Sequence, residues 1–434
     1  MPADRNPDVQ KCPVASGTDH HHRSSDGHRS RFGRQRTPTG IPVYTEDLYS
    51  VSAIEDPYPH YRAMRELGPV VWLEKQRVYA LTRYAEVKQV LADDATYRSS
   101  GSVAMNPVAR RIGNRSFLMS DDDAHIAQRK VAAHRLTPRA LRPLRADVNA
   151  LAERVVRDAV AKQYVDGVED IALKLPMTVV PDLIGWPQRG RKDLVKWAGA
   201  IFDMLGPLNG VSMRSTAASL RMLYFVHSLA RRRDVVAGSI AEEMIEHIDA
   251  GRLRAADLPA FLMDYLGPSI DTTASGIAAA LWLFAKHPDQ WDLLRQDPDA
   301  LLPNAINEVI RIESPLRAFA RRAEIDSIIG GVPVPAGAQL LVMYASANRD
   351  ELAWEEPDRF DITRDALAHV GFGYGVHGCA GQGLSRMETE AVLRALLRHV
   401  GRIEQAGTPE IAVNNIIHRF SFLPLHLVPD PKGK

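Results

Sequence analysis

Apolar residues recur at helical spacing over most of the chain. Between residues 124 and 318 such patterns follow one another with short polar breaks, and two more precede them at residues 61–67 and 84–92. The predicted helices of the long helical stretch cover residues 124–136, 138–161, 181–184, 191–202, 212–232, 237–250, 258–285, 289–295 and 303–313. Strand-type patterns are fewer and shorter, at residues 70–73 and 78–81, which are predicted to form a hairpin, and at residues 323–334, 338–343 and 414–427. Residues 99–116 have no clear period and are predicted to be a long loop, of a kind that often faces a substrate. The chain is therefore predicted to be mainly α-helical with a small β-rich portion.

The first 42 residues differ from the rest, because they are rich in Arg, Ser, Gly, Pro and Asp and have almost no apolar periodicity. We expect a disordered tail at residues 1–42 and a single domain over residues 43–434. Three consecutive histidines at residues 20–22 and Cys12 could bind a metal ion adventitiously. Their spacing fits no closed zinc site, so a solvated tail is the favoured interpretation.

Composition narrows the partners of this chain. Of its 434 residues 45% are hydrophobic and 25% are charged, which is typical of a soluble globular protein. A net charge of +1 gives no overall attraction to nucleic acid or to an anionic membrane. The longest apolar run, residues 277–285, is about half of the roughly 20 residues that a membrane span needs, and the start lacks a signal-peptide pattern. We therefore expect a cytoplasmic protein with no nucleic-acid or membrane partner.

The densest local signal is the stretch Phe-Gly-Tyr-Gly-Val-His-Gly-Cys-Ala-Gly at residues 372–381. Its four glycines allow the backbone to approach a flat group closely, and a helical pattern follows at once. Cys379 thus precedes a helix N-terminus, where amides and the helix dipole favour a thiolate and a bound metal. A lone cysteine is more often a small core residue, so the decision depends on the whole string. Two cysteines in the chain are too few for an iron–sulfur cluster.

The string matches the haem-ligand signature F-G-x-G-x-H-x-C-x-G at every specified position, and from about residue 56 to residue 429 the chain resembles bacterial cytochrome P450 enzymes. This resemblance implies the cytochrome P450 fold, haem b with its iron bound by Cys379, and monooxygenation with O2. Electrons would come from NAD(P)H through a reductase, a ferredoxin or both. A cluster of basic residues could face such a partner, although a charge run is usually a solvated surface: Arg135, Arg139, Arg142 and Arg145.

Further positions agree with the resemblance. By analogy with the family, the haem propionates would be bound by His125, Arg129, Arg321 and His377. Guanidinium and imidazole donors suit carboxylates in a dry site, although each histidine taken singly is more often an ordinary core or surface residue. The family's buried ion network would be formed here by Glu308, Arg311 and Arg359. A Glu-x-x-Arg pair alone is weak, because most such pairs are surface salt bridges.

The predicted helix at residues 258–285 resembles the helix that crosses the distal face of the haem. Its Asp271 and Thr272 match the family's acid–alcohol pair, in which a carboxylate supplies protons and a hydroxyl positions dioxygen. Alternatively, the hydroxyl bonds back to a helix carbonyl, and both roles can coexist. Pro268 and Ser269 stand where relatives carry Ala-Gly or Gly-Gly, so the kink is expected to come from the proline.

Within the family, the chain is most similar to enzymes that O-demethylate or hydroxylate small para-substituted aromatic acids, on residues 206–209, 346–350 and 369–371. This resemblance implies pocket residues Phe202, Leu205, Leu316, Phe319 and Phe420. The positions around the relatives' substrate carboxylate carry Gly101, Met263, Asp264 and Gly267 instead.

Because a carboxylate beside Asp264 would be repelled, we expect a neutral methoxy-aromatic such as a guaiacol in preference to a para-substituted benzoate. One alternative is a monooxygenase that tailors a larger terpenoid or polyketide. A second alternative, of another class, is a non-catalytic haem-binding sensor or carrier. The acid–alcohol pair argues against the sensor or carrier, because such a protein needs no proton delivery.

Overall fold

The computed structural model describes residues 37–113 and 116–431, and the described residues belong to one compact unit. The predicted tail falls mostly outside these ranges, at residues 1–36, together with Cys12 and the three histidines. Ile41 is buried, and the carbonyl of Pro42 accepts a hydrogen bond of 2.8 Å from the amide of Trp72. The packed chain thus includes the last two residues that the sequence assigned to the tail.

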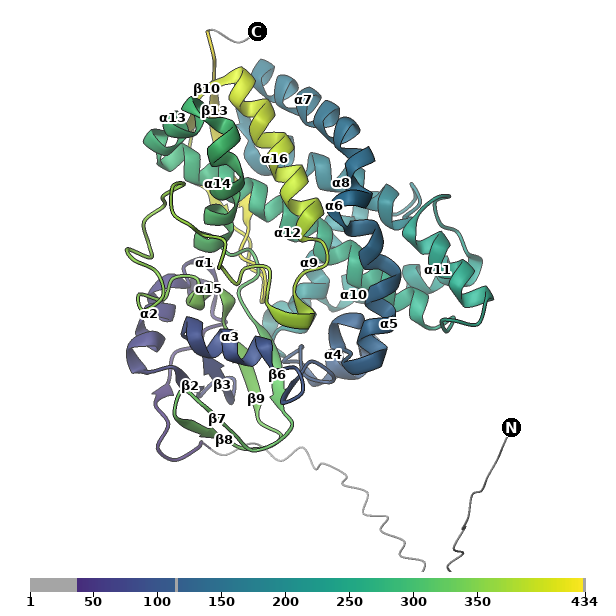
Figure 1. Cartoon of the computed structure of the whole chain (residues 1–434), viewed down its shortest axis with the longest axis vertical. Coiled ribbons are helices and arrows are strands. Elements are labelled where there is room, and N and C mark those ends of the chain that lie inside the picture. Colours follow the sequence, from purple (N-terminus) through teal and green to yellow (C-terminus); the bar gives the residue numbers. More distant parts are fainter. Residues whose placement is uncertain (1–36, 114–115, 432–434) are drawn as a thin grey trace, which may run out of the picture. The chain divides into compact units, whose positions relative to one another are not determined.

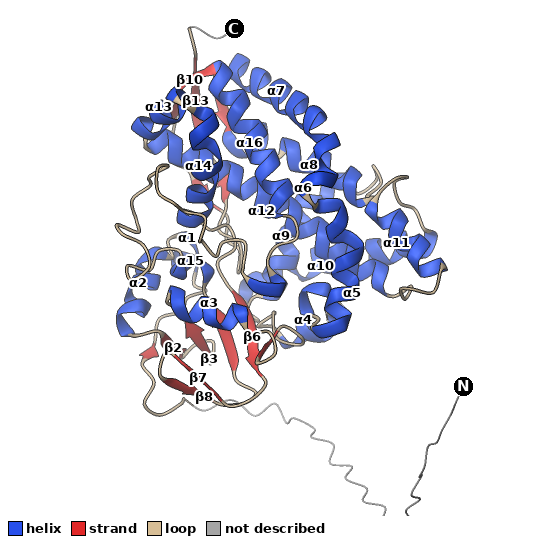
Figure 2. Ribbon diagram, in the orientation of Figure 1, coloured by secondary structure: helices blue, strands red, loops and turns tan. Residues whose placement is uncertain are grey.

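Helices make up most of the described chain (Figure 2). Their bounds are α1 Val51–Glu55, α2 Tyr58–Leu67, α3 Tyr84–Ala92, α4 Pro107–Ile112, α5 Asp122–Ala133, α6 Pro138–Leu141, α7 Arg145–Lys162, α8 Lys174–Ile184, α9 Leu194–Leu205, α10 Gly210–Arg232, α11 Ile240–Asp249, α12 Asp257–Lys286, α13 Pro288–Gln296, α14 Pro298–Ile312, α15 Tyr344–Ala347 and α16 Gln382–His399. Two short turns matter for the site, η1 Phe117–Met119 and η6 Gly375–His377.

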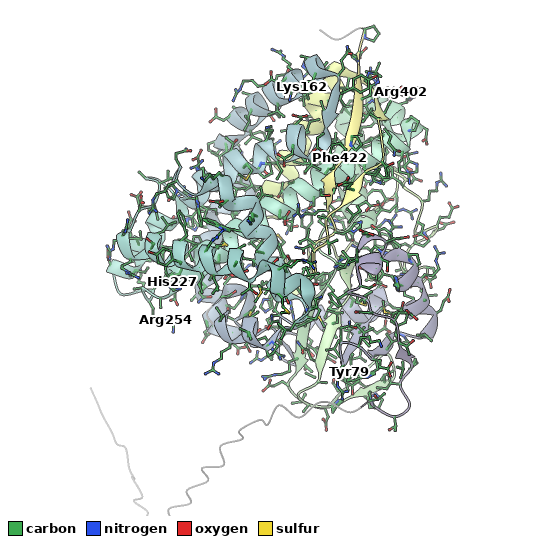
Figure 3. The ribbon with its side chains drawn as sticks, turned by 180° about the vertical axis from the view of Figure 1, so that it is seen from behind. Tyr79, Lys162, His227, Arg254, Arg402 and Phe422 are labelled. Atoms are coloured by element: carbon green, nitrogen blue, oxygen red, sulfur yellow. The ribbon has the colours of Figure 1, made fainter. Side chains whose placement is uncertain are left out.

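The strands form four small sheets. Their bounds are β1 Val43–Tyr44, β2 Val70–Leu73, β3 Val78–Leu81, β4 Tyr97–Arg98, β5 Tyr164–Asp166, β6 Phe319–Ala323, β7 Ser327–Ile329, β8 Val332–Val334, β9 Gln339–Val342, β10 Val400–Gln405, β11 Glu410–Ile411, β12 Phe420–Phe422 and β13 Pro424–Pro429. The largest sheet has the order β1-β2-β3-β9-β6-β4, and a three-stranded sheet has the order β10-β13-β5. Figure 3 shows the largest sheet around Tyr79 of β3, and the smaller sheets around Arg402 of β10 and Phe422 of β12.

Several predicted elements are confirmed at their bounds. The hairpin predicted at residues 70–73 and 78–81 is β2 and β3, which pair antiparallel with Val70 opposite Leu81. The long helix predicted at residues 258–285 is α12, which is continuous although it contains Pro268. The loop predicted at residues 99–116 contains one helix, α4, whose first turn is capped by the side chain of Asn106. That helix was missed because its six residues are too few to show a period.

Helix α12 lies at the centre of the main hydrophobic core, where it packs against α8, α9, α10, α14 and α16. It is apolar on several faces, with Leu262, Ile270, Ile277 and Leu281 all buried, as expected for a helix surrounded by others. Because α16 also packs against α12, the loop that leads into α16 is brought opposite the middle of α12 (Figure 1). None of the described helices combines the length and the apolar character that crossing a bilayer requires.

Candidate active site

A cavity, partly open to solvent, lies between α12 and the loop before α16. On one side it is lined by residues of that loop, including Phe372, Gly378 and Cys379. We call this the sulfur side. On the opposite side it is lined by α12 and by η1. We call this the helix side. The two sides bring together segments that are about 110 residues or more apart in the sequence.

Main-chain geometry shapes the sulfur side. The amide of Cys379 donates to the carbonyl of Phe372 at 2.8 Å. Gly375 has φ +69°, and a Cβ there would lie 2.4 Å from the carbonyl oxygen of Leu91, so only glycine lets the loop pass α3 this closely. A Cβ on Gly381 would instead point between the sulfur of Cys379, at 3.9 Å, and Ser269 of α12. The glycines therefore keep space open directly above the sulfur.

The thiol of Cys379 faces this cavity. The side chain of Cys379 has an exposed surface, and it lines the cavity. Burial raises the pKa of the Cys379 thiol, and this outweighs the hydrogen bonds from the amides of Gly381 and Gln382 and the charges of Arg129 and Arg386. The amides at the helix start thus lower the pKa of this thiol, as the sequence predicted, while burial opposes them. A bound metal ion would displace the proton, with the two amides already aimed at the sulfur.

Three of the four residues predicted to bind propionates line the cavity. Arg321 is 4% exposed, donates to the carbonyl of Ala320 at 2.9 Å, and has no ion pair with a carboxylate in the described part of the chain. Arg129 donates to the carbonyl of Gly378 at 2.5 Å. His377 lies with its Nε2 3.2 Å from Oδ1 of Asp121. A buried guanidinium without a carboxylate partner is costly, so Arg321 indicates an anionic group in the cavity.

The fourth residue, His125, lies behind His377 and does not line the cavity. Its ring centroid is 4.1 Å from that of His377, and its ring nitrogens lie 3.0 Å from the carbonyl of Phe117 and 3.3 Å from that of Val376. Burial raises the pKa of Asp121, but hydrogen bonds from His377, Ser100 and Ser99 hold it well below its usual range. An ionised Asp121 thus fixes His377, and His125 supports His377 from behind.

On α12 the acid and the alcohol occupy different surroundings. Thr272 lines the cavity and donates to the carbonyl of Pro268 at 2.6 Å. Asp271 is 2% exposed, lies outside the lining, and has Oδ1 3.3 Å from Nε of Arg419. Burial raises the pKa of Asp271, and the charge of Arg419 partly opposes this. Thr272 therefore lines the cavity and also bonds back to a carbonyl of its own helix, so the two arrangements considered from the sequence occur together.

The buried ion network is present with one correction. Arg311 and Glu308 are both fully buried and are joined by bonds of 2.6 Å and 2.8 Å. The further cation on Glu308 is Arg364, at 3.3 Å, and not Arg359 as expected. The side chain of Arg359 points to the surface and pairs with Glu356, so only its carbonyl reaches Arg311. The chain turns back after Phe360, and this turn places Arg364 next to Glu308.

Of the expected substrate residues, four line the cavity: Phe202, Asp264, Leu316 and Phe319. The cavity lining does not include the other four, Leu205, Met263, Gly267 and Phe420. Gly267 faces α9, where a Cβ would lie 3.1 Å from Ile201. Phe420 packs on Trp282 with ring centroids 5.7 Å apart, and Leu205 is buried in the second core cluster. Met263 packs against the main core.

Several lining residues were not expected, among them Phe117, Leu118, Tyr265, Ile310 and Tyr344. For three of them the sequence contained a feature that could have indicated a position at the cavity. Phe117 and Leu118 directly follow the long loop that was expected to face the substrate. Tyr265 lies seven residues before Thr272, which places both on one helix face. Ile310 and Tyr344 lie in segments whose cavity-facing side no sequence pattern revealed.

These features fit a flat tetrapyrrole with two carboxylates. The glycines leave room above a sulfur ligand, and the guanidinium groups of Arg129 and Arg321 provide donors for carboxylates at the cavity edge. A thiol on one side and a helix with a hydroxyl on the other, across the same space, define a haem-thiolate site. Among the described residues no cluster of three or more His, Cys, Asp or Glu side chains could hold a separate metal ion.

Comparison with known proteins agrees with this class. The family model of Cytochrome P450 matches residues 153–411. Cytochrome p450 CYP199A2 of Rhodopseudomonas palustris is 36% identical over 394 residues, which cover 90% of this chain and 95% of that protein. The steroid C26-monooxygenase of Rhodococcus jostii is 27% identical and covers 88% of this chain and 84% of its own length. The crystal structure of CalO2 has a TM-score of 0.78 at 26% identity, over 89% of this chain and 99% of that one.

The chain belongs to the cytochrome P450 family. It is a monooxygenase with a cysteine-ligated haem, and enzymes of this family use O2 and receive electrons from redox partners.

Proposed function

We propose that this cytochrome P450 O-demethylates or hydroxylates a small, neutral aromatic compound, with Cys379 as the ligand of the haem iron. The observation that carries the proposal is the carboxyl of Asp264, which lines the cavity together with several aromatic and aliphatic side chains. Phe117, Phe202, Leu316 and Phe319 line the same cavity and suit a flat ring. The resemblance of the sequence to enzymes of small aromatic acids supports the aromatic class.

Asp264 disfavours a substrate carboxylate. Its oxygens accept hydrogen bonds of 2.7 Å from Ser116 Oγ and 2.7 Å from the amide of Phe117. Burial raises the pKa of Asp264 to about 7, against the effect of these hydrogen bonds. Above that pH the group is an anion on the cavity wall, which repels a benzoate and tolerates a phenol or a methoxy group.

Bound haem supplies the iron at which dioxygen is activated, and a thiolate ligand favours cleavage of the dioxygen bond. The chain's own contribution begins at Thr272. Because its hydroxyl donates to Pro268, its lone pairs are free to accept a hydrogen bond from a group in the cavity. Asp271, whose pKa burial raises, is able to hold a proton one residue behind that hydroxyl.

The test is a titration of the purified holoenzyme with guaiacol and with para-methoxybenzoate, followed by the shift of the haem absorption. We expect a saturable shift with guaiacol and weak or absent binding of the benzoate at pH 8. An Asp264→Asn variant removes the charge at nearly constant size, and it should bind the benzoate more tightly while its affinity for guaiacol changes little. Tight benzoate binding by the unchanged enzyme would contradict the proposal.

A larger substrate is the second candidate, because one relative is named a steroid C26-monooxygenase. A steroid included in the same titration distinguishes the two candidates, since a cavity with aromatic walls close to the haem should respond to guaiacol and not to the steroid. Product analysis with a reductant and surrogate redox proteins then separates an enzyme from a haem-binding carrier, which would form no product.

The partner is proposed to be a ferredoxin, a reductase or both, recognised through two arginines. Arg135 and Arg145 already pair with Glu243 and Glu390. Arg139 and Arg142 are exposed and have no ion pair within the described ranges 37–113 and 116–431. Reversing the charge with Arg142→Glu should weaken the salt dependence of haem reduction, whereas Arg145→Glu serves as the matched control. An unchanged salt dependence in Arg142→Glu would exclude this surface as the docking site of the redox partner.

A cytoplasmic location of the protein stays a prediction.

A further inference from the structure

The hydroxyl of Tyr265 is a buried polar group that none of the roles above uses. Tyr265 lies on α12, is 3% exposed and lines the cavity. Its hydroxyl oxygen has no hydrogen-bond partner within the described part of the chain. A buried hydroxyl left without a partner is energetically costly, so such groups are nearly always bonded. The missing partner is therefore expected to be a group that binds in the cavity.

Two aromatic rings hold the ring of Tyr265 in place. Its centroid lies 4.8 Å from that of Phe117, with the planes 20° apart, and 4.6 Å from that of Phe261. The backbone of Phe117 is in turn fixed by its hydrogen bond to Asp264. Since two aromatic rings pack on the tyrosine, its ring has a defined position. A group placed this firmly is suited to bind a ligand atom of fixed location.

Ring contacts and charge connect Tyr265 to the residues predicted to bind the propionates. A series of ring contacts runs from Tyr265 through Phe117 and His125 to His377, with centroid distances of 4.8, 6.0 and 4.1 Å. Arg129 lies near enough to lower the pKa of Tyr265 by its charge, although burial and the charge of Asp264 raise that pKa well above its usual value. At neutral pH the group is thus a neutral phenol, which offers its proton to an acceptor.

We propose that Tyr265 donates a hydrogen bond to a carboxylate of the bound haem, at the part of the cavity where Arg129 and His377 also lie. A carboxylate is the acceptor that this surrounding favours, because the neighbouring Arg129 is a cation and His377 is a hydrogen-bonding imidazole. A neutral aromatic substrate would offer only a weaker acceptor and would need to lie at the cavity edge. This inference rests on the haem site proposed above, and it adds a cofactor-binding residue on the helix side to those predicted from the sequence.

The test compares haem retention in the wild-type holoenzyme and in Tyr265→Phe, which keeps the ring stack and removes one oxygen atom. Haem dissociation is followed by transfer to an excess of a globin apoprotein. We expect dissociation from the variant to be about five- to tenfold faster, since a hydrogen bond to a charged acceptor is lost. The matched control is Tyr49→Phe, whose buried hydroxyl donates to Met105 at 3.0 Å outside this cavity, and it should retain haem like the wild type.

Haem dimethyl ester provides the chemical complement, because its carboxyl groups are neutral and accept hydrogen bonds less strongly. Reconstituted with this ester, wild type and Tyr265→Phe should lose the cofactor at similar rates. An equal rate with normal haem would overturn the proposal. The same several-fold difference with both cofactors would also overturn it, because the hydroxyl would then act through packing or another acceptor.

A guaiacol titration of Tyr265→Phe covers the remaining interpretation. If haem retention is normal and guaiacol binding weakens, the hydroxyl serves the substrate and the proposal is wrong. Circular dichroism of the two holoenzymes should match, because the substitution leaves the core packing intact. Failure of the haem site itself is distinguishable, since the wild type would then lack thiolate-type absorption bands whatever residue stands at position 265.

Discussion

The two sides of the cavity are held in shape by different kinds of interaction. On the sulfur side the loop at residues 372–381 is fixed by main-chain hydrogen bonds and by Gly375, which no other residue can replace without a clash. The buried pair of Arg311 and Glu308 lies on α14, which packs against α16. On the helix side the shape comes from side chains, such as Thr272 bonded to Pro268 and Asp264 bonded to η1.

This difference in the kind of interaction corresponds to a difference in role between the two sides of the cavity. The sulfur side holds a cofactor that is the same throughout the family, so its geometry needs a rigid main chain. The helix side is proposed to select the substrate, and side chains there can vary without moving the backbone. Substitutions on the sulfur side should therefore cost cofactor binding and stability, whereas substitutions on the helix side, other than at Tyr265, should change coupling and selectivity. Four predictions test this contrast.

The largest effect is expected at Cys379. Replacing it with serine removes the thiolate, and a neutral hydroxyl is a poor iron ligand, so the reduced carbon monoxide complex should lose its thiolate-type band and turnover should fall below detection. The measurement is the difference spectrum of the reduced protein together with product analysis. Retention of the band and of product formation would show that another residue binds the iron and would remove the basis of the whole site.

The next effect concerns stability on the sulfur side. Arg311→Met leaves Glu308 buried with only Arg364 near it, and breaking a buried pair in this way costs about 3–5 kcal/mol. Denaturant unfolding of the holoenzyme should show that loss. Arg359→Met is the matched control, because its guanidinium is exposed, and it should change the free energy of unfolding by less than about 0.5 kcal/mol. An equal loss of unfolding free energy in both variants would show that Arg359 does belong to the buried ion network.

The same contrast explains what the sequence could predict. The cysteine loop was readable because a local string of glycines reports a backbone requirement, and α12 and the β2–β3 hairpin were readable from their periods. The cavity wall was not readable in the same way. Phe420 and Leu205 pack elsewhere, because which apolar residues face a cavity depends on the crossing of distant elements. Arg364 was missed because the turn after Phe360 sets its direction.

The third prediction tests the helix side through Thr272. Thr272→Ala removes the hydroxyl that lines the cavity, so electrons should be consumed with several-fold less product per reductant, while haem content and stability remain near wild type. Thr272→Ser keeps the hydroxyl and should restore most of the coupling. The ratio of product formed to NAD(P)H oxidised is the measurement. If the ratio of product to NAD(P)H oxidised is unchanged in Thr272→Ala, the hydroxyl of Thr272 serves only to bend the helix.

The smallest effect is a pH dependence that arises at Asp264. Burial raises its pKa to about 7 in the folded protein, whereas an unfolded chain releases that proton near pH 4. Between these values the folded state binds more protons than the unfolded state, so the group makes stability fall as pH rises from about 4 to 7. Asp264→Asn removes this titration. Relative to wild type, its free energy of unfolding should rise by about 1–2 kcal/mol between pH 5 and pH 8, a value reduced for the cavity exposure of the group.

Glu388 on α16 provides the comparison on the sulfur side for this last prediction. It is fully buried, has no hydrogen-bond partner in the part of the chain that the structure describes, and burial raises its pKa to about 8. Glu388→Gln should therefore shift stability with the same sign, but over a range that extends about one pH unit higher. The two variants differ in ligand response: Asp264→Asn should also alter benzoate binding, because Asp264 lines the cavity, whereas Glu388→Gln should not. If both variants altered benzoate binding equally, the division of the cavity into a cofactor-holding side and a selecting side would be wrong.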